Sequence, residues 1–205
     1  MRSALILLAL TCLAGLPGFA ATLEITIKDA KGEALEDAVV WAMPKPGPAP
    51  VRKRDAAVGQ KDKTFVPFVT VVQTGTAVQF PNQDPIRHHV YSFSPAKVFE
   101  IKLYAGTPVA PIVFDKPGEV VLGCNIHDHM LAYIYVVDTP YFAKTGKDGR
   151  ARLEGLPAGD YELLTWHPAQ TSPVASQAWR LRGDETAGAG FVVPLTPLPP
   201  RIPAK

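Results

Sequence analysis

The segment EVVLGCNIHDHMLAYIYVV, residues 119–137, consists of two apolar runs separated by a polar stretch. Side chains at alternate positions of a β-strand face the same side of its sheet. If Cys124 faces a protein core, Val120 and Leu122 face it too. If Met130 faces the core, so do the three apolar residues Ala132, Ile134 and Val136. The segment therefore predicts two core strands joined by the seven-residue loop 124–130, at one end of a β-sandwich.

Short runs of the same kind recur along the chain. Two strands are predicted between residues 22 and 43, and others at 65–73, 76–80, 89–93, 98–104, 111–114, 151–153, 161–166, 177–181 and 190–193. Turn signals lie between them, the chain holds 21 prolines and 16 glycines, and no long stretch has helical periodicity. We therefore predict an all-β protein, in which one Greek-key β-sandwich is combined with a second, smaller β-sandwich.

The two ends and one internal stretch differ from these runs. Arg2, an apolar run over 5–14 and small residues up to Ala20 are typical of a cleaved secretory signal, so we expect residues 1–20 to be removed on export to the periplasm. The prolines of 44–50 and the basic residues 52–54 predict an exposed loop. The proline-rich end, 196–205, predicts a disordered tail. A net charge of +2 gives no reason to expect nucleic acid as a partner, and we expect no membrane span.

The cysteines point to a metal independently of any motif. Of the two in the chain, Cys12 lies in the predicted signal, so the exported protein would keep Cys124 alone. A single cysteine cannot form an internal disulfide. A free thiol in an oxidising compartment is vulnerable unless it is buried or bound to metal. We therefore expect Cys124 to be a metal ligand.

The surrounding residues complete a ligand set. Cys124, His127 and Met130 have the spacing C-x2-H-x2-M, and His88 begins another predicted strand. Two imidazoles, a thiolate and a weak axial thioether are the ligands of a mononuclear blue-copper electron-transfer site. We predict one copper ion bound by these four side chains. His89 is an alternative to His88, which the sequence does not exclude.

Other readings of these residues remain open. Cys124 could be an inert buried thiol, and Met130 could simply fill the core. If His89 and His129 also bind, the cluster would suit zinc or a different copper centre. A cysteine–histidine nucleophile would need a third, orienting group and an oxyanion hole, for which we find no pattern, so we expect no enzyme activity. His167 lies in the other predicted sandwich, and we expect it to be structural.

Residues 65–137 resemble the cupredoxin family, which includes plastocyanin and amicyanin. The matching residues are the run 75–82 (GTAVQFPN), then His88 followed by Val90, and the C-x2-H-x2-M loop. The pattern continuing into 137–142 (VDTPYF) resembles bacterial periplasmic proteins of the methylamine-utilisation or plastocyanin-like type. Two positions depart from the family: His89 replaces the usual asparagine after the first histidine, and Asp128 replaces a proline in the loop.

A second resemblance concerns the flanking segments. Residues 29–40 and 145–161 together resemble the carboxypeptidase regulatory-like (prealbumin-like) β-sandwich, with TGKDGRARLEGLPAGDY as the second half. This implies a split domain, 22–45 and 139–195, with a cupredoxin domain at 60–138 between its halves. In the alternative, the strands of 22–43 complete the copper domain.

The resemblance to cupredoxins implies a carrier of single electrons between redox protein partners, such as a dehydrogenase and a cytochrome. Two other functions remain open. The same ligands could serve copper delivery or scavenging without redox turnover, and the second sandwich could be a cell-envelope binding module.

Overall fold

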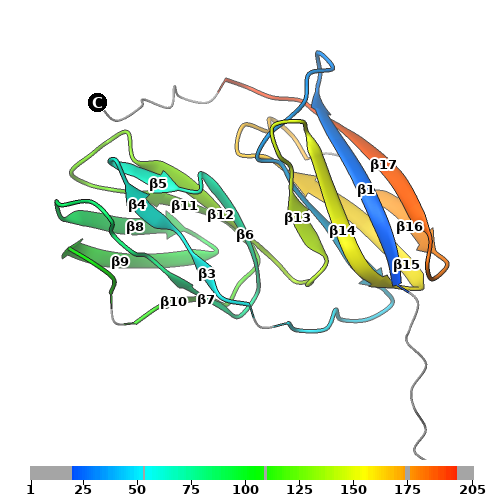
Figure 1. The fold of residues 1–205 in the computed structure, drawn as a ribbon, viewed down its shortest axis with the longest axis horizontal. Helices are drawn as coiled ribbons and strands as arrows, with labels where there is room; N and C mark the ends of the chain where they lie inside the picture. Colours follow the sequence, from blue (N-terminus) through cyan, green and yellow to red (C-terminus); the bar gives the residue numbers. More distant parts are fainter. Residues whose placement is uncertain (1–19, 53, 109, 174–175, 198–205) are drawn as a thin grey trace, which may run out of the picture.

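The structure is a computed structural model that describes residues 20–52, 54–108, 110–173 and 176–197. Every regular element of these residues is a β-strand, which confirms the all-β prediction. The strands form two sandwiches, seen side by side in Figure 1. The predicted signal peptide lies outside the described residues except for Ala20, and so does the predicted tail beyond Pro197.

The first group of strands, which we call the flanking sandwich, combines both ends of the described chain. Its sheets have the strand orders β14-β1-β17 and β13-β2-β15-β16, so the two N-terminal strands pair with C-terminal ones. Apolar side chains from both sheets form one core. The strands are β1 (Ala20–Asp29), β2 (Val39–Lys45), β13 (Phe142–Lys144), β14 (Arg150–Pro157), β15 (Gly159–Trp166), β16 (Gln177–Leu181) and β17 (Thr186–Val193).

The second group, the middle sandwich, is formed by the chain between β2 and β13. A five-stranded sheet, β6-β12-β11-β8-β9, faces the three-stranded sheet β10-β7-β3, and a hairpin, β4-β5, lies at one end. Its strands are β3 (Ala56–Ala57), β4 (Gly59–Lys61), β5 (Thr64–Val66), β6 (Val69–Gln73), β7 (Thr76–Gln79), β8 (His88–Ser94), β9 (Lys97–Tyr104), β10 (Ile112–Phe114), β11 (Gly118–Gly123) and β12 (Leu131–Val137).

The core of the middle sandwich follows the alternation of residues 119–137. Val120, Leu122 and Cys124 are buried in one cluster with Met130 and its alternate successors on β12, Ala132, Ile134 and Val136. β11 and β12 are antiparallel, with Gly123 opposite Leu131. The expected orientation of both strands is confirmed, and the loop 124–130 closes the end of this pair.

One strand prediction needs correction, and the three short strands β3, β4 and β13 were not predicted. The run 65–73 is two strands, β5 and β6, because Pro67 has no N–H for a sheet hydrogen bond. The stretch 54–62 contains β3 and β4, held by a parallel pairing with β7 and by a hairpin with β5. The short strand β13 pairs with β2 and has too few residues for its pattern to be read.

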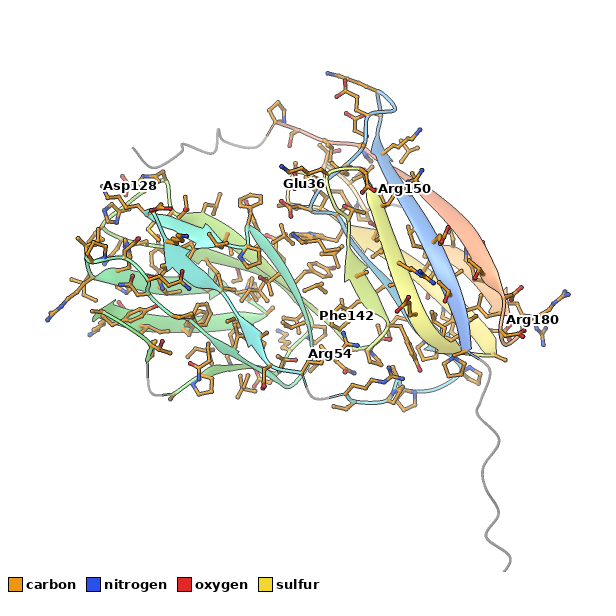
Figure 2. The ribbon with its side chains drawn as sticks, viewed as in Figure 1. Glu36, Arg54, Asp128, Phe142, Arg150 and Arg180 are labelled. Carbon is orange, nitrogen blue, oxygen red and sulfur yellow. The ribbon has the colours of Figure 1, made fainter. Side chains whose placement is uncertain are left out.

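Arg52 and Arg54 are exposed and lie outside any strand, as predicted, and both contact aromatic rings. The guanidinium of Arg52 lies 5.4 Å from the ring centre of Tyr141, and that of Arg54 lies 5.5 Å from that of Phe142. Figure 2 shows Arg54 and Phe142 together between the two sandwiches. Such cation–π contacts join the two chain segments that cross between the sandwiches.

The sandwiches meet through an apolar, aromatic interface. Val39 and Trp166 of the flanking sandwich pack with Val69 and Tyr133 on the outer face of the five-stranded sheet. Trp166 stacks on Tyr135, with ring centres 4.5 Å apart, and its Nε1–H donates to Glu119 Oε2 at 3.2 Å. Among the described residues, we find no helix with the length and apolarity that a membrane crossing needs.

Candidate metal centre

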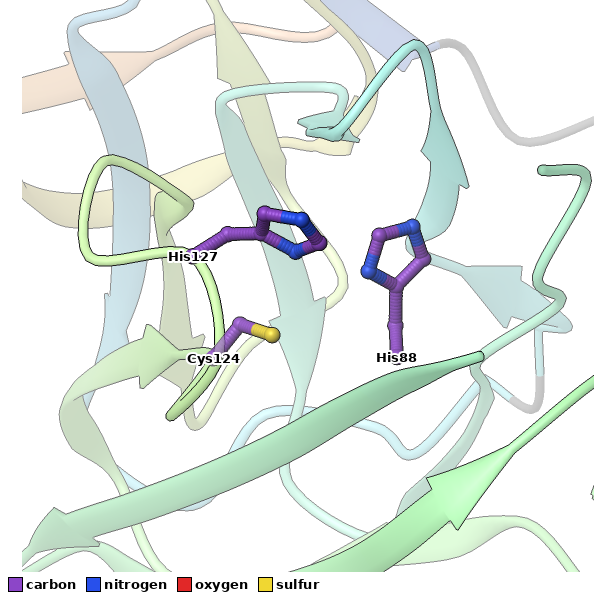
Figure 3. A group of neighbouring side chains, drawn as sticks. All are labelled: His88, Cys124 and His127. Atoms are coloured by element: carbon purple, nitrogen blue, oxygen red, sulfur yellow. The ribbon is translucent and has the colours of Figure 1, made fainter. Parts of the chain in front are cut away.

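Three of the predicted ligands meet at the end of the middle sandwich. His88 comes from the start of β8, and Cys124 and His127 come from the loop between β11 and β12 (Figure 3). One ligand atom from each lies within 4.8 Å of the other two. His88 is fully buried, Cys124 is 3% exposed, and His127 is half-buried. Cys124 is a free, buried cysteine.

Strand register explains why residues so far apart in sequence converge. β8 runs antiparallel to β11, and Tyr91 lies opposite Gly123. His88, three residues before Tyr91, therefore lies beside the loop that follows Gly123. Inside the loop, the N–H of Met130 donates to the carbonyl of His127 at 2.9 Å, which closes the turn. The site thus rests on two sheet pairings and one tight loop.

The ring nitrogens facing this site lack hydrogen-bond partners. Nδ1 of His88 and Nδ1 of His127 are both buried, and neither has a partner among the described residues. Buried polar atoms are nearly always hydrogen-bonded, because an unpaired one costs about 1–3 kcal/mol. Two such nitrogens beside a buried thiol fit a metal ion, which would accept all three electron pairs.

The other nitrogen of His88 is held by a carboxylate. Nε2 lies 2.6 Å from Oδ2 of Asp84. Asp84 also accepts hydrogen bonds from the backbone N–H groups of Asp62 at 2.6 Å and Lys63 at 2.9 Å. Burial opposes ionisation of Asp84, but these amides and His88 together lower its pKa below the usual value. A carboxylate in this position fixes the tautomer and the orientation of a ligand histidine.

The surroundings of His127 favour its neutral form. Its pKa is lowered by burial first, and then by the nearby His88, His129 and Lys63, with Asp84 acting in the opposite direction. The rings of His88 and His127 have centres 5.0 Å apart. A neutral imidazole is the form that binds a metal.

The neighbouring histidines are engaged elsewhere. Nε2 of His89 is also buried without a hydrogen bond, but it lies 3.0 Å from Oε1 of Glu100, and the ring contacts Tyr91. Nε2 of His129 lies 3.1 Å from the carbonyl oxygen of Lys63. The structure therefore groups His88, and not His89, with Cys124 and His127. Asp128 is exposed on the loop. Figure 2 shows it at the opposite end of the molecule from Arg180 of the flanking sandwich.

Met130 is buried in the same core cluster as Cys124. Its exposed fraction is 2%, and it begins the return of the chain into β12. This placement suits both a core residue and an axial ligand, so the role of its sulfur stays a prediction.

Sequence analysis missed two residues that lie next to His88, Tyr104 and Asp84. Tyr104 lies opposite His88 on β9, and its hydroxyl donates to the carbonyl of Phe80 at 2.7 Å and accepts from Gln60. Burial, and to a smaller extent Cys124, raises the pKa of Tyr104 to about 12. Neither Tyr104 nor Asp84 belongs to a motif. Asp84 lies in a proline turn four residues before His88, and only this spacing could have drawn attention to it.

No family model matches the chain, and no curated protein matches it. Among solved structures, a copper-containing nitrite reductase from Thermus scotoductus is 26% identical over 44% of this chain and 25% of its own, with a TM-score of 0.39. A purple cupredoxin from Nitrosopumilus maritimus is 18% identical over 40% and 98% of the two chains, with a TM-score of 0.35. Amicyanin from Paracoccus versutus is 15% identical over 47% and 97%, with a TM-score of 0.35. The chain spans a quarter of that reductase.

Proposed function

We propose that this protein is a blue copper protein with one mononuclear type 1 site, formed by His88, Cys124, His127 and Met130. The observation that carries the proposal is the pair of buried, unpartnered Nδ1 atoms of His88 and His127 next to the buried thiol of Cys124. A purely structural arrangement would leave these two nitrogens without compensation.

The donor set favours copper. A thiolate is a soft ligand that suits Cu(I), and imidazole suits Cu(II), so both oxidation states are accommodated. Met130 adds a weak thioether from the same core cluster. A copper ion held by these residues supplies one-electron chemistry. The protein holds the donors in place through Asp84, the β8–β11 pairing and the turn of the loop. Such a rigid arrangement keeps the cost of changing oxidation state small.

We infer from this that the protein carries single electrons between redox proteins and is not an enzyme. Four protein ligands leave no open position for a substrate. His127 is the ligand nearest to solvent, and its neighbour Ile126 is exposed, so this end is the expected contact for a partner. A dehydrogenase as donor and a cytochrome as acceptor are part of the proposal, which rests here on the resemblance of residues 65–142.

A copper-delivery role would use the same ligands but would require that the copper ion be released readily to an acceptor protein. Burial of His88 and Cys124 favours retention, because neither ligand can be reached by an acceptor protein without opening the end of the sandwich. Electron transfer is therefore the function that we place first.

Location and domain organisation belong to the same proposal. We propose export to the periplasm with cleavage after the signal at 1–20, and a cupredoxin domain between the two halves of a carboxypeptidase regulatory-like domain. The predicted start of this domain, 60, moves to 56, because β3 and the buried Val58 belong to the middle sandwich. The separate apolar cores of the middle and flanking sandwiches support this division. N-terminal sequencing of the mature protein from a periplasmic extract would test the cleavage.

Optical titration with Cu(II) tests the copper site. We expect saturation at one copper per chain and an intense visible thiolate-to-copper band, which Cys124→Ser abolishes. His89→Gln is the matched control, because His89 is adjacent to His88 but contacts Glu100, and this variant should keep the band. A colourless protein that prefers zinc would refute the type 1 site. An intact blue band with rapid copper loss to an acceptor and irreversible voltammetry would instead support delivery.

A further inference from the structure

His129 lies in the loop that carries two of the candidate ligands, but it is not grouped with them. Its ring contacts the ring of His127, with centres 5.9 Å apart and planes at 63°. Its Nε2 lies 3.1 Å from the carbonyl oxygen of Lys63, in the turn between β4 and β5. A carbonyl oxygen only accepts hydrogen bonds, so Nε2 carries the proton of this imidazole. His129 thus links the ligand His127 to a separate hairpin.

The β4–β5 turn has a backbone conformation that is unusual for its residues. Asp62 and Lys63 have φ angles of 52° and 53°, in the left-handed region. They lie between the paired residues Lys61 and Thr64, which is the φ pattern of a type I′ turn, normally built with Asn-Gly. Other residues keep this conformation only where surrounding contacts fix it. Here both backbone N–H groups of the turn donate to the carboxylate of Asp84, at 2.6 Å and 2.9 Å.

The β4–β5 turn is also anchored to the body of the middle sandwich. Phe65, which follows the turn on β5, is buried in the core cluster of this sandwich. On the other side of the turn, Gln60 of β4 is fully buried. Its N–H donates to the carbonyl of Pro81 at 2.9 Å, and its carbonyl accepts from the N–H of Gln83 at 2.8 Å. The turn therefore has a fixed position relative to the segment between β7 and β8, which carries Asp84.

These contacts form a closed circuit around the candidate metal centre. From His127, the circuit runs through His129 to the backbone of Lys63. From there it continues through Asp84, whose Oδ2 lies 2.6 Å from Nε2 of His88. The side chains of His88 and Asp84 are 0% and 8% exposed, so water hardly competes for this contact. The circuit closes between the two ligand imidazoles, whose centres are 5.0 Å apart (Figure 3).

We propose that the β4–β5 turn is a clamp that couples the orientations of His88 and His127, with Asp84 and His129 as its two positioning residues. The clamp rests on the proposed function, because it serves to hold two metal ligands. A metal ion needs both imidazoles in place at once, and one turn fixes both before the ion binds. Only backbone atoms of Lys63 take part, so its side chain is not required.

Nuclear magnetic relaxation of the copper-free protein tests the coupling first. In His129→Leu, the ligand loop loses its link to the turn, and we expect increased motion also at Asp84 and His88, on the other side of the turn. The reciprocal variant, Asp84→Asn, should increase motion at His127. His129→Gln keeps a donor for the carbonyl of Lys63 and should restore the unmodified pattern. Increased motion that stays within the substituted segment in both variants would overturn the clamp.

A double-mutant cycle on copper affinity tests the clamp in the loaded protein. Asp84→Asn and His129→Leu should each weaken binding about tenfold. Independent effects would multiply to about a hundredfold, whereas breaking one circuit twice should leave the double variant within about threefold of either single variant. His89→Gln, outside the circuit, should leave the loss caused by Asp84→Asn at about tenfold. Lys63→Gly keeps the backbone contacts and should preserve the coupling. A hundredfold loss in the double variant would overturn the clamp.

Failure of the clamp and failure of the proposed function give different results. A protein that shows no thiolate-to-copper band refutes the type 1 site, whatever the relaxation data show. A blue protein in which the increased motion stays within each substituted segment keeps the type 1 site and refutes the clamp.

Discussion

The two sandwiches differ in the hydrogen bonding of their histidine Nδ1 atoms. In the flanking sandwich, His167 is buried and its Nδ1 accepts a hydrogen bond from the N–H of Ala169 at 3.1 Å. In the middle sandwich, the same atom of His88 and of His127 is buried without a partner. His167 completes a turn of its own segment, whereas the other two converge on Cys124.

A nitrogen without a hydrogen bond, together with convergence on Cys124, distinguishes His88 and His127 from a structural histidine; His89 shares the first feature but not the second. A satisfied imidazole contributes to the fold without any further group. A buried imidazole nitrogen without a hydrogen bond lowers the stability of the folded protein until a group such as a metal ion binds to it. Substitutions at the two kinds of histidine should therefore affect different measurements.

The largest effect is expected for ligand removal. His88→Gln should weaken copper binding well beyond the ~10–100-fold that outer-shell changes typically cost, because a direct ligand is lost. His167→Gln should leave copper binding unchanged and lower the free energy of unfolding by about 1 kcal/mol, the usual value of one hydrogen bond. Competitive copper titration and urea unfolding measure the two effects. If the two variants lose copper equally, the distinction between the sandwiches fails.

The next largest effect concerns the contact between the sandwiches. Trp166→Ala removes the stack on Tyr135 and should lower the free energy of unfolding by about 3 kcal/mol, as is common for a buried Trp truncation. We also expect unfolding of the two sandwiches to separate into two steps. Trp179→Ala on β16, away from Tyr135, serves as the control and should keep a single step. A single, unshifted transition for Trp166→Ala would mean that the interface contributes little.

A smaller effect is expected at Asp84. Asp84→Asn keeps an oxygen for His88 but removes the charge and places an amide near the N–H groups of Asp62 and Lys63. Copper affinity should fall about tenfold, the lower end for outer-shell partners, and the reduction potential should rise because a less electron-rich imidazole favours Cu(I). Asp115→Asn, at an exposed aspartate bound to Lys97, should change neither. An unchanged potential in Asp84→Asn would remove Asp84 from the account.

The smallest effect depends on pH. Burial raises the pKa of Glu119 above its usual 4.5, although the hydrogen bond from Trp166 opposes this. An acid whose pKa is higher in the folded state favours folding in its protonated form, so its contribution is lost as pH rises through the folded pKa. Glu119→Gln should therefore gain stability relative to the unmodified protein as pH rises above about 4.5. Denaturation of both apo proteins from pH 4 to 7, as ~1-unit steps, would show this; a difference that does not vary with pH would contradict it.

Alternation in residues 119–137 was enough to predict which side chains enter the core, because strand geometry leaves only two choices. The convergence of His88 with Cys124 and His127 was predicted from spacing and resemblance, and the structure brings the three together. Tyr104 could not be predicted, because its place opposite His88 depends on the register between β8 and β9, which local patterns do not encode. Asp84 lies only four residues before His88, but its contact depends on how the turn between them folds. Arg52 and Arg54 are exposed as predicted, but their aromatic partners could not be predicted, because these lie on a distant segment.

X-ray absorption at the copper edge tests the central claim most directly. The copper-loaded protein should show two nitrogen donors and one short bond to sulfur, and His88→Gln should remove one of the nitrogens. The unmodified pattern should persist in His89→Gln and His129→Gln. Copper surrounded only by nitrogen and oxygen, or a nitrogen lost on substituting His89 but not His88, would contradict the assignment of the site.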